Sequence, residues 1–423
     1  MRRVVVLIAV PVLGLALVVL AGALLIPRGE RSPASSGPVR ETDPIVLAQQ
    51  RLQRLPDDWT TWAQLGMAYI QRARTTGDPA DHQLARQALD RSLAIRPENN
   101  ATALTGLGAL AGAHHDFPEA LKHGRAALEV DPYRAAALGV VADALTELGR
   151  YDEAFATVQK MVDLKPDAAS YSRASYAWEL RGETSRATEA MGRALDASYL
   201  PADSAFARLQ LGQLALGAGD PDTAERHFAE GLRLVPGHPP LRVGLARVRA
   251  ARGDLTGAAG EFRAVLAAVP EPAYVAELGD LLAAAGQRAE ADREYTRARQ
   301  AWAAETEGGH PPEADPVLFA ADYRDPGALD AARRLYDRQP GIGGADAMGW
   351  ALRAAGRPEE ALRYADQALA LGTRNPLTHY HRGMILFDLG RDADARADLE
   401  TALRINPHFS VVHAPAARAA LKR

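Results

Sequence analysis

A six-residue pattern that opens with glycine and closes with alanine recurs along this 423-residue chain and limits what it can fold into. Mostly polar residues separate the two small ones in GRYDEA, GETSRA, GDPDTA, GDLTGA, GQRAEA, GRPEEA and GRDADA, which begin at Gly149, Gly182, Gly219, Gly253, Gly286, Gly356 and Gly390. Alanines at the closing position lie 34 residues apart at 120–154, 224–258 and 361–395. A period of this length predicts an array of similar units in place of one globular core.

The residue types in the pattern predict two antiparallel helices per unit. Glycine ends the first helix, since it adopts a left-handed backbone at little cost. Acidic residues such as Asp152 and Glu153 then fall in the first turn of the second helix, where the helix dipole favours negative charge. Prolines such as Pro132 and Pro166 end that second helix.

Small residues are also expected where the two helix axes approach each other, because a larger side chain there would overpack the contact. We expect glycines of the first helices to face alanines of the second helices; the pairs are Gly66 with Ala85, Gly108 with Ala120, Gly212 with Ala224, Gly279 with Ala291 and Gly383 with Ala395. Each unit therefore depends on the close approach of two helices.

The segment WAQLGMAY carries Trp62, Leu65, Gly66 and Tyr69, and it resembles the W-x2-L-G-x2-Y core of the tetratricopeptide-repeat superfamily. The resemblance implies an all-α fold, a right-handed α-solenoid of about ten helix pairs. We expect the array to cover residues 45–410, with a loop near 304–316, and a capping segment over 411–423. The layout, with an apolar N-terminus before the repeats, resembles bacterial membrane-anchored proteins of this family.

The N-terminal residues 1–26 are predicted to form a transmembrane helix, and 27–44 a flexible linker rich in Pro, Ser, Gly and charge. Val4 to Ile26 are 23 residues without a charge, which as a helix span about 34 Å, enough for the hydrocarbon core. A cleaved signal peptide is the alternative, but its apolar region is usually shorter. The first interpretation gives a single-pass membrane protein with its body outside the cytoplasm; the second gives a secreted one.

The composition of the chain excludes several classes of function and of binding site. The net charge of −4 argues against nucleic-acid binding, and the absence of cysteine excludes thiolate catalysis, cysteine-based zinc sites and disulfides. No catalytic motif was recognised, so we expect neither an enzyme nor a cofactor. The most metal-like feature is His379 and His381, with His408 and His413 nearby, yet histidines two apart on a helix point in different directions, which favours ordinary packing.

In this superfamily the first helix of each repeat lines a concave groove, so the resemblance assigns groove positions by register. These candidate partner-binding residues are Asp143, Glu147, Tyr176, Glu179, Gln213, Arg247, Asp280, Trp350, Arg353, Tyr380 and Phe387. The function expected is a membrane-tethered, non-enzymatic scaffold that binds a protein or peptide partner. The alternative is a chaperone-like accessory for metal, haem or secreted-protein maturation. Packing of Trp350 and Phe387 between repeats is an equally open interpretation of those two residues.

Overall fold

The computed structural model describes residues 43–76, 78, 80–308, 311 and 313–423. The predicted transmembrane segment 1–26 and nearly all of the predicted linker 27–44 lie outside the described residues. Within the described part, no helix combines the length and the apolar character needed to cross a membrane. The chain divides into two compact units, whose described parts are residues 43–170 (unit 1) and 171–423 (unit 2).

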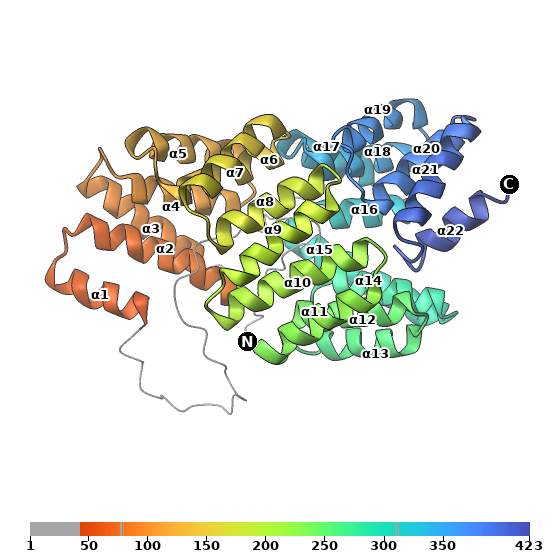
Figure 1. Ribbon diagram of the computed structural model, residues 1–423, viewed down its shortest axis with the longest axis horizontal. Helices are drawn as coiled ribbons and strands as arrows, with labels where there is room; N and C mark the ends of the chain where they lie inside the picture. Colours follow the sequence, from red (N-terminus) through yellow and green to blue (C-terminus); the bar gives the residue numbers. More distant parts are fainter. Residues whose placement is uncertain (1–42, 77, 79, 309–310, 312) are drawn as a thin grey trace. The chain divides into compact units, whose positions relative to one another are not determined.

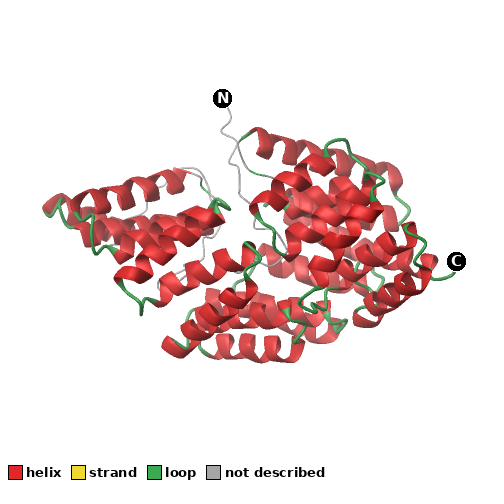
Figure 2. Cartoon of the chain, turned by 90° about the horizontal axis from the view of Figure 1, so that it is seen from above, coloured by secondary structure: helices red, strands yellow, loops and turns green. Residues whose placement is uncertain are grey.

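Helices joined by loops make up both units (Figure 1), and Figure 2 shows the same helices from above. Unit 1 contains α1 (Pro44–Arg54), α2 (Trp59–Thr76), α3 (Ala80–Ile95), α4 (Ala101–Ala113), α5 (Phe117–Val130), α6 (Ala135–Glu147), α7 (Tyr151–Leu164) and the start of α8 (Ala168–Leu180).

Unit 2 continues with α9 (Thr184–Asp196), α10 (Pro201–Gly217), α11 (Pro221–Leu234), α12 (Pro239–Ala251), α13 (Leu255–Leu266), α14 (Pro272–Ala284), α15 (Arg288–Glu307), α16 (Ala314–Asp322), α17 (Ala328–Arg338), α18 (Ile342–Ala354), α19 (Pro358–Leu369), α20 (Pro376–Asp388), α21 (Asp392–Ile405) and α22 (His413–Ala420). Helices α2 to α21 form ten consecutive pairs, with α8 joined to α9 by the hydrogen bond from Ser175 Oγ to the Ala187 oxygen, which confirms the predicted all-α solenoid over the described residues.

The recurring glycines act as predicted. All seven pattern glycines have φ between 69° and 89°, the left-handed region that glycine tolerates best. The second helix starts directly afterwards; α7, for example, has Asp152 and Glu153 in its first turn. Helices α5 and α7 end before Pro132 and Pro166, at Val130 and Leu164. Local sequence therefore sets the helix ends.

The expected close approach of small residues is confirmed in three pairs. A Cβ atom added at Gly66, Gly108 or Gly383 would lie 3.2 Å from the carbonyl oxygen of Ala85, Ala120 or Ala395, respectively.

At Gly212 and Gly279 the space is filled differently, because an added Cβ would overlap the rings of Phe228 and Tyr295. In these two pairs glycine makes room for an aromatic ring one turn further along the second helix.

The irregular segment expected at 304–316 is shorter in the structure. Helix α15 continues to Glu307 and α16 begins at Ala314. Helix α16, the first helix of the next pair, has only nine residues. Helix α22, of eight residues, lies within the predicted capping segment 411–423.

Unit 2 closes on itself, because its first two helix pairs contact its last two. The Asn406 side chain, just after α21, donates from Nδ2 to the backbone oxygen of Leu216 near the end of α10, at 2.8 Å. A Cβ at Gly219 would lie 3.1 Å from the oxygen of Ile405. The turn at Gly182 meets the backbone of Gly372 in the α19–α20 loop in the same way. These contacts form a seam between residues up to 190 positions apart.

Candidate functional site

The first helices of the pairs form the inner face of each unit. Successive first helices contact each other, as α2 with α4 and α4 with α6 in unit 1, and α14 with α16 and α16 with α18 in unit 2. Successive second helices in the described residues show no comparable contact. Stacked pairs whose first helices lie closer together curve towards that side, so the first helices line the concave surface.

In unit 1 the candidates Asp143 and Glu147 lie one turn apart on α6, and both are half-buried. Burial and, as the smaller cause, the neighbouring carboxylate of Asp143 together raise the pKa of Glu147 to about 8. The inner face of this unit therefore presents a carboxyl group whose charge is suppressed near neutral pH.

At the start of unit 2, Tyr176 and Glu179 lie on α8 and Gln213 on α10. Tyr176 and Gln213 are half-buried, and Glu179 is exposed. Desolvation by the surrounding inner face still raises the pKa of Glu179 to about 7. These three polar side chains remain partly accessible on the inner face.

The candidate Arg247, on α12, is held by Glu277 of α14, a residue that sequence reasoning did not select. Its Nε donates to Glu277 Oε1 and its Nη2 to Oε2, both at 2.8 Å. Burial alone would lower the pKa of Arg247, but the carboxylate of Glu277 outweighs this effect and raises it. Such a two-bond pair fixes the guanidinium against the next repeat.

Asp280 on α14 is held by two tyrosines, one on the partner helix α15 and one just after α16. The hydroxyls of Tyr295 and Tyr323 each donate to Asp280 Oδ1 at 3.0 Å. Burial raises the pKa of Asp280 to about 6, although these two hydrogen bonds act in the opposite direction.

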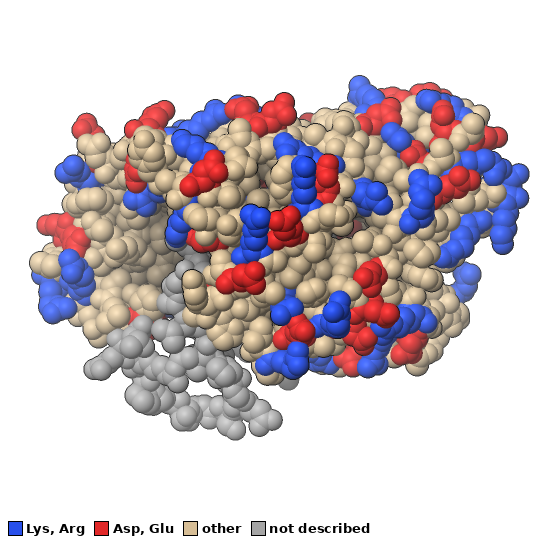
Figure 3. Space-filling model, viewed as in Figure 1, with Lys and Arg blue, Asp and Glu red and all other residues tan. Residues whose placement is uncertain are grey.

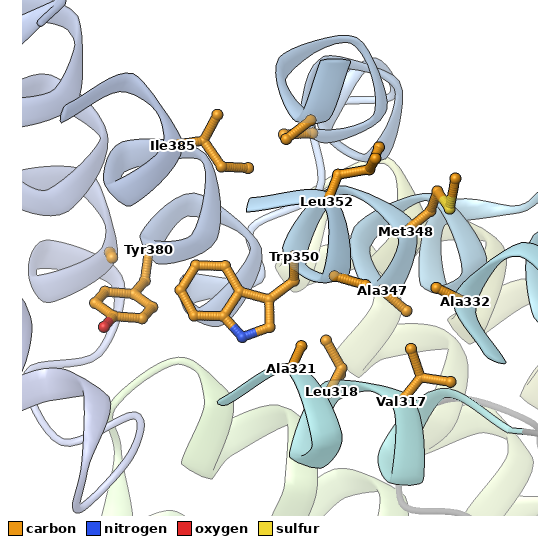
Figure 4. Close-up of a cluster of buried hydrophobic side chains, with 14 of the residues drawn as sticks. Val317, Leu318, Ala321, Ala332, Ala347, Met348, Trp350, Leu352, Tyr380 and Ile385 are labelled. Atoms are coloured by element: carbon orange, nitrogen blue, oxygen red, sulfur yellow. The ribbon is translucent and has the colours of Figure 1, made fainter. Parts of the chain in front are cut away.

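Trp350 and Tyr380, on α18 and α20, are packed inside a hydrophobic cluster, with 4% and 5% of their surfaces exposed. Figure 4 shows the indole of Trp350 beside Tyr380 and next to α16. The indole Nε1 donates to Asp322 Oδ1 at 2.8 Å, and the ring stacks on His381 at 4.2 Å between centroids. Both aromatic residues therefore serve the packing between repeats in this structure.

The other two candidates of this region flank the same cluster. Arg353 lies over the Trp350 ring at 4.6 Å, and its Nε is 2.8 Å from Asp388 Oδ2. Phe387 is half-buried and packs against the cluster.

Three segments of the chain match family models described as "Tetratricopeptide repeat". They are residues 111–176 and 215–281 for one model and 347–408 for a second. This chain is a tetratricopeptide-repeat protein. The matched segments fall on helix pairs of both units.

Several solved structures resemble this repeat protein at low identity, and two of the three described here are tetratricopeptide-repeat proteins. One from Parabacteroides merdae is 19% identical, covering 56% of this chain and 92% of its own, with a TM-score of 0.43. A thermophilic one from Thermus thermophilus is 20% identical, covering 44% and 99%, with a TM-score of 0.39. PilW, a type IV pilus biogenesis factor, is 22% identical, covering 47% and 91%, with a TM-score of 0.41. No curated protein matches significantly.

The histidines of this repeat protein that looked most metal-like are paired with different carboxylates. His379 Nδ1 lies 3.0 Å from Asp398 Oδ1, and His381 Nδ1 lies 3.0 Å from Asp346. In the part of the chain that the structure describes, no group of three or more histidines and carboxylates is placed to hold a metal ion. The favoured interpretation, that these histidines belong to the packing, agrees with these contacts.

Proposed function

We propose that this protein is a non-enzymatic scaffold that binds a protein or peptide partner along the inner face of its helix array. The observation that carries the proposal is the mutual contact of the first helices, which places them on one concave side in each unit. Tetratricopeptide repeats are typical of proteins that act through protein–protein contacts, because stacked repeats provide an extended binding surface.

The charge distribution supports a protein partner over nucleic acid. The net charge is −4, and on the face drawn in Figure 3 the basic side chains lie among acidic ones. Nucleic-acid binding generally relies on a basic area that neutralises several phosphates. A polypeptide segment requires only a few hydrogen-bonding and apolar anchors, such as those at Tyr176, Glu179 and Gln213.

The proposal includes attachment to a membrane through Val4–Ile26, with the body outside the cytoplasm. It is supported by the length of this uncharged stretch and by the linker-like composition of 27–44. External protease added to intact cells should degrade the body and leave a membrane-bound N-terminal fragment. A body protected until the cells are lysed would refute this orientation, and a body recovered only in the medium would support signal cleavage.

Site-specific photo-crosslinking tests the partner-binding surface. A benzophenone amino acid at Gln213, on first helix α10, should form an adduct with the partner in cells. The same probe at Arg226 is the matched control, since Arg226 is exposed on second helix α11 of the same pair. Adducts of equal yield at both positions, or adducts at Arg226 alone, would contradict an inner-face binding site.

A further inference from the structure

The segment that follows the last helix pair, Phe409–His413, packs onto the inner face of unit 2. It is a mostly irregular stretch after α21 that ends with His413, the first residue of α22, and its backbone is held by Ser410. The Ser410 Oγ accepts from the backbone N–H groups of Val412 and His413, at 3.2 Å and 3.0 Å. These bonds hold the backbone of the segment at the point where α22 begins.

Aromatic contacts join this segment to two of the predicted groove residues. The rings of Phe409 and Tyr380 lie 5.9 Å apart, and those of His413 and Tyr380 lie 4.9 Å apart. His413 also meets Trp350 edge-on at 6.4 Å. Such separations fit favourable ring pairing. The segment therefore contributes to the burial of both groove aromatics.

A charged contact anchors the other end of the segment. The Nε2 of His413 lies 3.3 Å from Asp322 Oδ2, while Oδ1 of the same carboxylate accepts from the Trp350 indole. Both oxygens of Asp322 are thus engaged by groups on other elements. The side chains of His413 and Asp322 keep 15% and 25% of their surface exposed, so this contact remains within reach of solvent.

The segment Phe409–His413 also contacts a neighbouring repeat. Val411 packs against a second hydrophobic cluster, which includes Tyr274, Tyr295 and Phe319. The segment thus bridges the inner faces of consecutive repeats from α14 to α20. Its residues Phe409, Val411, Val412 and His413 are each only half-buried, whereas Trp350 and Tyr380 beneath them are buried.

We propose that Phe409–His413 is an internal ligand of the groove, which competes with external partners. The site it occupies would accept a polypeptide segment with an aromatic residue and, four positions later, a histidine. The aromatic residue lies against Tyr380 and the histidine pairs with Asp322, next to Trp350. This inference rests on the proposed function in so far as the inner face binds polypeptide. A partner of this chemistry binds by replacing the internal segment, and its affinity is reduced by the free energy of that displacement.

Binding of a peptide in trans tests the proposal. The probe is a fluorescent, end-blocked peptide of residues 407–415, PHFSVVHAP, titrated with the full chain and followed by anisotropy. We expect the Phe409→Ala/His413→Ala variant to bind it about tenfold or more tightly than the wild type, because the internal copy no longer competes. Adding Asp322→Asn should reduce that binding again by about tenfold.

His408→Ala is the matched control, since His408 is exposed in the same stretch and should leave binding at the wild-type level. Equal binding by wild type and double variant, no detectable binding by either, or no effect of Asp322→Asn would overturn the proposal.

Hydrogen exchange on the wild-type chain gives a second test that needs no variant. If the segment is a separable ligand, the amides of Val412 and His413 should exchange about tenfold or more faster than those in the middle of α18 and α20, by local opening. Exchange of all these amides at one common rate would show that the segment is part of the core and would overturn the proposal. Neither result depends on crosslinking at Gln213, so the two proposals fail separately.

Discussion

Replacing Gly182 with alanine tests whether the seam in unit 2 contributes to its stability. Gly182 ends α8 with φ of 71°, and its backbone meets that of Gly372 in the α19–α20 loop. An alanine Cβ would overlap the carbonyl oxygen of Gly372, which is backbone and cannot rotate away. The substitution therefore combines an unfavourable backbone conformation with a steric conflict across the seam.

The two contributions can be separated by a matched control at Gly286. This glycine has the same role after α14, with φ of 80°, but an added Cβ would meet nothing within 4 Å. A left-handed alanine costs roughly 1–2 kcal/mol at either position. Overpacking at the seam adds about 1–3 kcal/mol at Gly182 alone. We therefore expect Gly182→Ala to lose about 1–3 kcal/mol more than Gly286→Ala.

Urea unfolding followed by tryptophan fluorescence measures this difference, and Trp178, on the helix that Gly182 ends, reports on the altered turn. Because long repeat arrays can unfold in stages, hydrogen exchange of α8 and α20 should accompany the urea curves. Gly182→Ala should speed exchange in both helices, which are distant in sequence. Equal destabilisation by the two variants, with no change of exchange in α20, would refute the inference that the seam contributes to the stability of unit 2.

Three further predictions concern packing and pH. Gly66→Ala should destabilise unit 1 by about 1–3 kcal/mol, because its Cβ would come 2.6 Å from Leu89 Cγ, whereas Gly112→Ala, with nothing within 4 Å, should be neutral or stabilising in thermal unfolding. Burial raises the pKa of Glu271 to about 8, so the free energy of unfolding should fall as pH rises from about 4.5 to 8, by on the order of 1–3 kcal/mol. Glu271→Gln should remove that slope in urea titrations at several pH values, and an unchanged slope would contradict it. Burial alone would lower the pKa of His413, and the charge of Arg353 acts in the same direction. The carboxylates of Asp322 and, to a smaller extent, Asp280 outweigh these effects and raise the pKa above its ordinary value. Folding therefore favours the protonated form of His413. Hydrogen-exchange protection of the Val412 amide, corrected for intrinsic exchange, should fall as pH rises from about 6 to 8 in the wild type. The His413→Gln variant should not show this fall.

Asp322, the acidic partner in the same ion pair, changes stability with pH in the opposite direction to His413. Burial alone would raise the pKa of Asp322, but His413 outweighs this effect and lowers it. Its contribution to stability is therefore present above its ordinary pKa and is lost as pH falls through the lowered value. The contact between His413 and Asp322 should be strongest in the interval between the ordinary pKa values of aspartate and histidine, about 4 to 6.5.

Local interactions explain how much of the fold could be predicted from sequence. The left-handed glycines, the acidic first turns and the terminating prolines each act within a few residues, so Gly149 and Pro132 mark helix ends without reference to the rest of the chain. The close contact of Gly66 with Ala85 depends only on two adjacent helices. Even where Phe228 replaces Ala224 as the nearest neighbour of Gly212, the pairing of α10 with α11 is as expected.

The candidate site was less predictable, because its contacts join residues far apart in sequence. The repeat register predicted that Arg247 lies on a first helix, but it did not predict that Arg247 pairs with Glu277 in the next repeat. Register also assigned Trp350 and Tyr380 to the groove, whereas the segment at Phe409 and His413 packs against them. The role of Asp322 had no sequence signal, since a single carboxylate at the end of a short helix is common.

The sequence by itself determined the repeated unit: where each helix begins and ends, and which helix pairs with which, because these follow from backbone preferences and from contacts between neighbours. Only the tertiary structure decided that Asn406 reaches Leu216 and that His413 reaches Asp322. The physical reason is that small rotations between successive pairs accumulate along the array. A slight change at each junction, too small for any residue pattern to specify, decides whether distant repeats meet.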